Sequence, residues 1–217
     1  MRHRWWWTMV TELARPDAVR RARWLNALTI GWNVIEGIVA IAAGLAAGSI
    51  SLIGFGLDSA IEVSAAAVLT WRLARERRDD CREDDDKIAQ RLVAVAFALL
   101  AAFVAFNAVG DLLTGRAPDP SLVGVVLAAV SLVVMPLVAR AKRKVAPTLG
   151  SRAAMAEATQ TDLCAALSAA LLVGLGLNAL FGWWWADPGA GLVIAAIAGY
   201  AAVTTWRAPS LAHTCCA

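Results

Sequence analysis

Histidine is nearly absent from this sequence: the 217 residues contain two, His3 and His213, each close to an end of the chain. We therefore expect no histidine among the ligands of an interior site. Several enzyme motifs are missing as well. There is no nucleotide-binding glycine loop, no nucleophile elbow and no HExxH motif of zinc proteases. The sequence gives no indication of an enzyme, and we expect a protein without catalytic activity.

Cysteine is also scarce, and its spacing excludes the common metal motif. The four cysteines, Cys81, Cys164, Cys215 and Cys216, form no CxxC pair. We assign three of them to the cytoplasmic side below, where thiols stay reduced, so no disulfide is expected. The pair near the C-terminus is interpreted as a frayed end, a weak metal-binding tail or an acylation site.

Apolar residues, in contrast, are abundant. They make up 59% of the chain, and the mean hydropathy of +0.62 is too high for an ordinary soluble domain. A helix needs about 20 residues to cross a hydrocarbon layer of ~30 Å. The charged first segment contains no signal peptide pattern. We predict an all-α polytopic membrane protein with six transmembrane helices, at residues 24–46, 49–71, 92–114, 121–139, 153–180 and 188–206.

Positive charge is almost confined to one side of these predicted helices. Of the 20 Lys and Arg residues, 19 lie in the terminal segments or in the connections 72–91 and 140–152. The exception is Arg116, on the other side. Basic residues favour the cytoplasmic side, so we predict both termini in the cytoplasm of a multi-pass cell (plasma or inner) membrane protein. The net charge of +3 then reflects topology, and we expect no nucleic-acid partner. The predicted division is an N-terminal segment at 1–23, a membrane domain at 24–207 and a tail at 208–217.

Two local patterns mark the ends of the predicted helices. The triplet Trp183 to Trp185 is typical of an aromatic anchor at the membrane interface. Asp187 followed by Pro188 predicts an N-cap and the first position of the last helix. The mixed-charge run RERRDDCREDDDK, residues 75–87, is interpreted as a solvated connection rather than a metal funnel.

Six acidic residues fall inside the predicted helices, where no Lys, Arg or His lies well inside a span to neutralise them. An ionised carboxylate at the membrane centre costs about 2.5–3.5 kcal/mol on insertion scales. We therefore expect these acids to be protonated, bridged by polar groups or matched to a cation from outside the chain. They are Glu36, Asp58, Glu62, Asp111, Glu157 and Asp162.

The strongest chemical pattern is the stretch GLDSAIEV, in which Asp58 and Glu62 stack one helical turn apart. Two stacked carboxylates supply half of an oxygen cage for a divalent cation, and a structural role gives no reason to stack two acids against their repulsion. Glu36 and Asp111 are left open between structural and pathway roles. Further polar faces carry Asn33 with Glu36, Asn107 with Asp111, and a stripe of Glu157, Thr161, Cys164 and Ser168 from which Asp162 is displaced by about 100°.

Three stretches resemble the membrane domain of the cation diffusion facilitators: GSISLIGFGLDSAIEVSAAAVLTWR, TQTDLCAALSAALLVGLGLN and WWADPGAGLVIAAIAGYAA. The resemblance covers residues 24–207. In that family the metal lies at mid-membrane between the second and fifth spans, which give two ligands each. The resemblance implies Asp58 and Glu62 as one pair and Asp162 in the other, whose remaining position falls on Ala158, which cannot bind a metal. Its replacement stays open among Glu157, Thr159, Gln160, Asn33, Glu36, Asn107 and Asp111, and Cys164 is a further candidate in the pathway.

The resemblance also implies an activity: efflux of a divalent transition metal in exchange for protons. Oxygen ligands favour Mn²⁺ or Fe²⁺, whereas the family favours Zn²⁺, so all three stay open. We expect no resident cofactor, and the expected partners are metal ions, protons, the bilayer and a second copy bound through membrane helices. Only 11 residues, Arg207 to Ala217, follow Trp206, so the family's cytoplasmic domain is expected to be absent.

Two other classes of protein are alternatives. A non-transporting membrane scaffold or subunit would use the buried acids structurally, but it would not need the Asp58 and Glu62 pair. A carrier of an organic cation or a proton channel would also use buried acids, but a binder of an organic cation should place aromatic side chains beside them, and only Phe55 lies near Asp58 in the sequence.

Overall fold

The computed structural model describes residues 15–75, 83–149 and 152–207, and within these ranges it consists of six α-helices without a strand. All six are long and apolar enough to cross a membrane. The prediction of an all-α, six-helix, multi-pass membrane protein is confirmed. The helices are α1 (Arg15–Ala47), α2 (Ile50–Arg75), α3 (Glu83–Thr114), α4 (Leu122–Leu149), α5 (Arg152–Phe181) and α6 (Ala186–Arg207).

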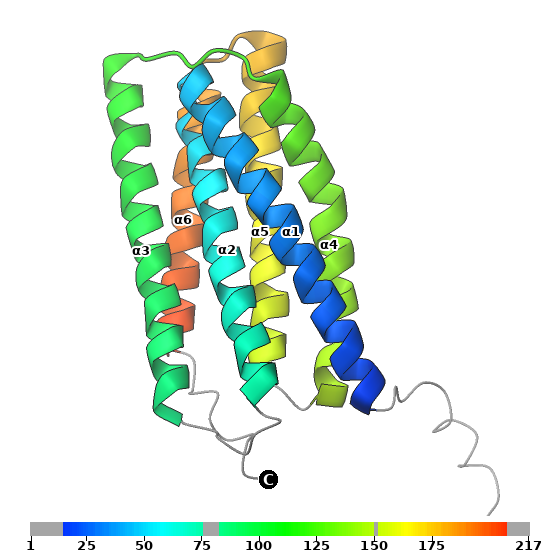
Figure 1. The fold of residues 1–217 in the computed structure, drawn as a ribbon. Helices are drawn as coiled ribbons and strands as arrows, with labels where there is room; N and C mark the ends of the chain where they lie inside the picture. The colour runs from blue at the N-terminus through cyan, green and yellow to red at the C-terminus, as the bar shows by residue number, and fades with distance from the viewer. Residues whose placement is uncertain (1–14, 76–82, 150–151, 208–217) are drawn as a thin grey trace, which may run out of the picture.

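Successive helices alternate in direction and stand side by side in one bundle (Figure 1). Helices α1, α2, α4 and α5 form a four-helix group, in which α1 packs on α2 and α4, and α5 packs on α2 and α4. Helices α3 and α6 pack on each other and cover the remaining side of α2, while α6 also contacts α5. The inward faces of α2 and α5 are therefore surrounded by protein, which is where buried polar groups can be placed at the lowest cost.

Three glycines end helices at the same end of the bundle. Gly48, Gly115 and Gly182 follow α1, α3 and α5, with φ values of 67°, 66° and 66°. This left-handed conformation is strained for residues with a Cβ atom and favours glycine after a helix. The connection between α1 and α2 is the shortest at this end, because only Gly48 and Ser49 separate the two helices.

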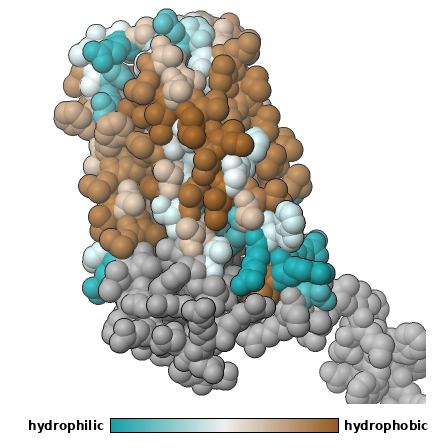
Figure 2. All heavy atoms as spheres, in the orientation of Figure 1, coloured by the Kyte–Doolittle hydropathy of each residue, from teal (hydrophilic) through white to brown (hydrophobic). Residues whose placement is uncertain are grey.

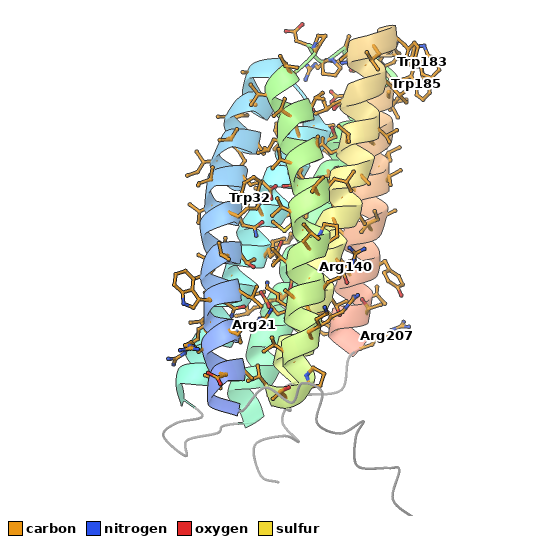
Figure 3. All side chains as sticks on the ribbon, turned by 90° about the vertical axis from the view of Figure 1, so that its right-hand side faces the viewer. Arg21, Trp32, Arg140, Trp183, Trp185 and Arg207 are labelled. Atoms are coloured by element: carbon orange, nitrogen blue, oxygen red, sulfur yellow. The ribbon has the colours of Figure 1, made fainter. Side chains whose placement is uncertain are left out.

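The surface is banded as a membrane protein requires. Figure 2 shows an apolar middle zone with hydrophilic residues gathered towards both ends of the bundle. Arg21, Arg140 and Arg207 lie in the half that contains the start of α1 and the end of α6, which we call the basic end (Figure 3). Trp183 and Trp185 stack with ring centroids 5.3 Å apart at the opposite end. This position fits the predicted aromatic anchor at an interface.

Several helices extend beyond the predicted spans at the basic end. Helix α1 starts at Arg15 rather than at 24, α3 starts at Glu83 rather than at 92, and α4 ends at Leu149 rather than at 139. Hydropathy detects only the part that fits the hydrocarbon layer, whereas Arg, Lys and Glu are good helix formers and let a helix continue. The second half of the mixed-charge run is thus the start of α3 and not a connection. The other half, 76–82, lies outside the described residues, as do His3, His213, Cys81, Cys215 and Cys216.

Helices α1 and α2 approach closely through small residues. A Cβ atom added at Gly56 would lie 2.7 Å from Cγ1 of Ile41 and 3.1 Å from the carbonyl oxygen of Gly37. Small residues at such contacts let membrane helices pack backbone to backbone. The close packing brings the acid on α1, Glu36, next to Ser59 of α2.

Helix α6 begins two residues before the predicted start, so Asp187 and Pro188 lie in its first turn. The Asp187 carboxylate is buried and accepts hydrogen bonds from Ser49, at 2.7 Å, and from Ser51. Asp187 thus lies inside the first turn and not at the expected N-cap, and its carboxylate joins the start of α6 to the start of α2. The negative charge lies at the positive end of both helix dipoles, which favours it there.

Candidate functional site

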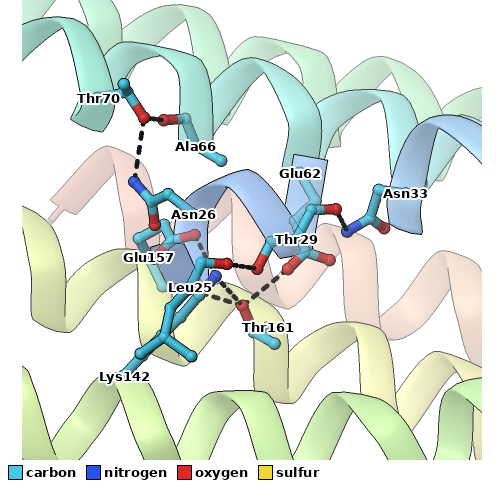
Figure 4. Close-up of polar contacts among 10 residues, drawn as sticks. All are labelled: Leu25, Asn26, Thr29, Asn33, Glu62, Ala66, Thr70, Lys142, Glu157 and Thr161. Carbon is cyan, nitrogen blue, oxygen red and sulfur yellow. Dashed lines mark hydrogen bonds and ion pairs between the residues drawn. The ribbon is translucent and has the colours of Figure 1, made fainter. Parts of the chain in front are cut away.

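Asp58 and Glu62 lie on the inward face of α2, and both are buried. The Asp58 carboxyl group interacts with the Cys164 thiol and with the carboxyl groups of Glu36 and Glu62. Oε1 of Glu62 accepts a hydrogen bond from the Thr161 hydroxyl at 2.7 Å (Figure 4). Its Oε2 atom is buried and has no hydrogen-bond donor among the described residues. Such an oxygen is costly to bury, so this position is suited to an added positive charge or a proton.

The predicted polar stripe of α5 faces the other helices of the four-helix group. Glu157, Thr161, Cys164 and Ser168 are all buried. Thr161 contacts Glu62, and the Cys164 sulfur lies 3.9 Å from Oε2 of Glu36. The residues that α5 brings to the acids are therefore a hydroxyl and a thiol.

Asp162 points elsewhere, away from Asp58 and Glu62. It forms a short ion pair with Arg143 of α4, and its side chain is 32% exposed. Successive residues of a helix are rotated by about 100°, so once Thr161 faces α2, its neighbour turns towards α4. Ala158, the other position implied by the family pattern, is buried, and the amide nitrogen of Gln160 is buried without a partner among the described residues.

Glu157 is paired with a basic residue. Nζ of Lys142, on α4, forms a short ion pair with its carboxylate and also donates a hydrogen bond to the Thr161 hydroxyl at 3.1 Å. The side chains of Lys142 and Glu157 are each only 4% exposed. A buried charge of either sign needs this kind of partner.

The expectation that no basic side chain reaches the buried acids is therefore wrong for Glu157 and Asp162. The reason is the length of α4, which runs past residue 139 and carries Lys142 and Arg143 along α5. Asp111 has a basic neighbour too, because Arg116 lies 3.8 Å from it at the end of α3.

Glu36 is the most fully bonded acid of the interior. It accepts hydrogen bonds from Ser59 at 2.9 Å, from the indole nitrogen of Trp32 at 3.2 Å and from Ser131. These donors lie on α2, α1 and α4, so the carboxylate ties three helices together. A carboxylate has about four acceptor positions, and three strong donors leave little capacity for a further ligand. Glu36 is thus fixed in place, in contrast to Glu62.

The two amides predicted as pathway residues bond within their own helices. The Asn33 side chain donates to the carbonyl of Thr29 at 3.0 Å, and its oxygen is buried without a partner among the described residues. Asn107 donates to the carbonyl of Phe103 at 2.8 Å. The structure thus ties Asn107 and Asp111 to α3 and its C-terminal end, apart from the acids of the four-helix group.

In the part of the chain that the structure describes, no three His, Cys, Asp or Glu side chains are grouped closely enough to hold one metal ion. Asp58, Glu62 and Cys164 are neighbours rather than a formed coordination sphere. Binding of a cation between α2 and α5 requires these side chains to turn towards a common point.

Comparison with protein families gives the identity of the fold. Residues 86–208 match the cation efflux transmembrane domain, which is more than half of the chain. The chain belongs to the cation efflux family. Its members transport cations, so this protein is a multi-pass cation transporter, and the resemblance predicted from the sequence is confirmed. No curated protein matches the chain.

Sequence reasoning missed three residues of this cation efflux protein's polar interior: Trp32, Ser131 and Lys142. Trp32 and Ser131 lie in apolar helices, and nothing in the local sequence indicates that they bond to each other across 99 residues. Lys142 offered a signal, because it follows the predicted end of the fourth span by three residues, where a basic side chain can still reach inwards.

Proposed function

We propose that this cation efflux protein carries a divalent transition-metal ion, Zn²⁺, Mn²⁺ or Fe²⁺, and that Asp58 and Glu62 bind it. The observation that carries the proposal is the Oε2 atom of Glu62, a buried carboxylate oxygen with no donor among the described residues, one turn from a second buried acid. Two carboxylates can balance the two charges of such an ion in a medium where an unbalanced charge is costly.

Helix α5 completes the proposed site with other residues than the family pattern implies. Thr161 and Cys164 replace the pair expected at 158 and 162, because they are the α5 side chains that reach Glu62 and Asp58. A hydroxyl oxygen and a sulfur are both acceptable ligands for a transition metal. Glu36, saturated by its donors, holds α1 and α2 in position beside the site.

The polar side chains also suggest a route. Along α5, Glu157 lies one turn nearer the basic end than Thr161, and along α2, Glu62 lies one turn nearer that end than Asp58. A cation entering from the basic end would meet Glu157 first and then Glu62. Since basic residues favour the cytoplasm, this direction corresponds to efflux.

We further propose that protons are exchanged for the metal. Carboxylates in a dry interior are less costly when protonated, so protons occupy Asp58 and Glu62 when the ion leaves and are released when it binds. Movement of α2 against α5 would expose the site first to one side of the membrane and then to the other.

The test is metal uptake into proteoliposomes under an imposed pH gradient, with Zn²⁺, Mn²⁺ and Fe²⁺ offered separately. We expect gradient-driven flux of at least one metal in the wild type, and its loss in Asp58→Asn and Glu62→Gln. Asp17→Asn is the matched control, because that acid is exposed and paired with Arg20 at the surface. Absence of flux for all three metals in a folded wild type would favour the scaffold alternative.

A further inference from the structure

A buried lysine lies at the basic end of the proposed pathway and has no role in the function described so far. Lys142 is the only buried Lys or Arg among the side chains that the structure describes. It comes from α4, which contributes no ligand to the proposed site.

The contacts of Lys142 connect it to that site in two steps (Figure 4). The ammonium group is paired with Glu157 and donates to the Thr161 hydroxyl at 3.1 Å. The same hydroxyl donates its own proton to Glu62 at 2.7 Å. One positive charge thus lies at the end of a hydrogen-bonded chain that leads to the oxygen atoms proposed to bind the metal.

The balance of charge depends on this lysine. Glu62 lies one turn from Asp58 along α2 and interacts with Glu157 of α5, and all three acids are buried. In the described ranges, Lys142 is the one basic side chain that reaches this group. A divalent ion beside Glu62 would bring positive charge close to the ammonium group in a medium that screens poorly. The metal ion and the ammonium group therefore repel each other.

We propose that Lys142 is a tethered cation that neutralises Glu157 beside the empty site and moves towards the basic end when a divalent ion binds. This inference rests on the proposed function. A monovalent ion would replace one positive charge by another, whereas a divalent ion adds a charge that the carboxylates can balance. Lys142 is thus a specificity-determining residue that favours divalent over monovalent cations.

The first measurement follows the amine itself. The chain has three lysines, and Lys144 lies two residues further along α4 with an exposed side chain. The full-length protein is acylated with an amine-specific reagent, with and without Mn²⁺ or Zn²⁺, and the modified lysines are quantified by mass spectrometry. We expect the metal to increase acylation of Lys142 severalfold and to leave Lys144 unchanged. The increase should be absent in Asp58→Asn.

The second measurement compares Lys142→Met with the control Lys144→Met. We expect Lys142→Met to bind Mn²⁺ or Zn²⁺ about tenfold more tightly, because the variant removes the repulsion between the positive ammonium group and the positive ion. Na⁺ and K⁺ should compete with the metal in this variant and not in the wild type. Lys142→Arg, which keeps the charge, should retain the selectivity of the wild type.

The outcomes separate this inference from the proposed function. Metal binding by the wild type, with acylation of Lys142 unchanged by the metal, would overturn the tethered-cation role and leave the metal site standing. Unaltered metal affinity and selectivity in a folded Lys142→Met would do the same. Absence of any divalent metal binding in the wild type would overturn both. The acylation measurement uses the wild type, so it decides the question even where Lys142→Met does not fold.

Discussion

Thr161 of α5 donates a hydrogen bond to Glu62 of α2 while accepting one from Lys142 of α4. A single hydroxyl thus joins the three helices at the acid that we propose as a metal ligand. The ammonium group can only donate, so the single proton of the hydroxyl goes to an acceptor, and the Glu62 carboxylate at 2.7 Å is closer than the Glu157 carbonyl at 3.2 Å.

Removing the Thr161 hydroxyl should take one hydrogen bond from Glu62 and one from Lys142. We expect Thr161→Val to lower the free energy of unfolding by about 1–3 kcal/mol, since it leaves a buried carboxylate oxygen and a buried amine each short of one hydrogen bond. Thr161→Ser should restore most of the loss. Ser168→Ala is the control, because among the described residues that hydroxyl bonds to the Cys164 carbonyl of its own helix and to no other helix. The measurement is denaturant unfolding in detergent micelles, and equal losses for Val and Ser at position 161 would contradict the interpretation.

The two ion pairs between α4 and α5 should differ in their contribution to stability. Lys142→Ala leaves Glu157 buried and unpaired, which costs about 3–5 kcal/mol. Arg143→Ala removes a partly exposed pair and should cost less than about 1 kcal/mol. Thermal unfolding of the two variants under the same conditions measures the difference. Addition of Glu157→Gln to Lys142→Ala should recover part of the loss, and a double variant less stable than the single one would argue against a charge effect.

The close approach of α1 and α2 predicts a position-specific response to side-chain size. Gly56→Leu forces atoms into the space occupied by Ile41 and the Gly37 carbonyl, so we expect a clear fall in the unfolding temperature. Gly31→Leu is the matched control on α1, since a Cβ atom there meets nothing within 4 Å. Similar unfolding temperatures for the two variants would show that the α1–α2 contact is not tight.

Metal binding should release protons. Carboxylates bind metal in the deprotonated form, so the affinity for Zn²⁺ or Mn²⁺ should fall as the pH is lowered. Addition of metal to the protein in weakly buffered solution should acidify it, by up to two protons for each ion bound. Glu62→Gln should release fewer protons per ion. A metal affinity that is independent of pH, with flux intact, would exclude exchange for protons while leaving metal transport.

The sequence predicted the membrane helices and the buried face of α5 because both depend on periodic patterns. Hydropathy located six spans, and helical spacing placed Glu157, Thr161, Cys164 and Ser168 on one face, where the structure has them buried. The same spacing separated Asp162 from that stripe. The resemblance implies Asp162 as a ligand, and in the structure its carboxylate is paired with Arg143 of α4.

What the sequence left hidden depends on contacts between distant residues. The length of α4 beyond the hydrocarbon layer decided which basic side chains reach α5, and hydropathy carries no information on that length. Asp187 was predicted from its local pattern, but its bonds to Ser49 and Ser51 cross more than 130 residues. Such partners follow from the packing of α2 on α6, which a single sequence does not specify.

The two-residue connection between α1 and α2 has a mechanical consequence. With only Gly48 and Ser49 between them, α1 and α2 cannot separate at this end. The hydrogen bond from Ser49 to Asp187 holds the same point against α6. During transport as proposed above, α1 and α2 would swing together as one stiff lever whose fulcrum is at Ser49. The amplitude of such a swing grows with distance from the fulcrum, so the widest excursion falls at the basic end, beside Lys142.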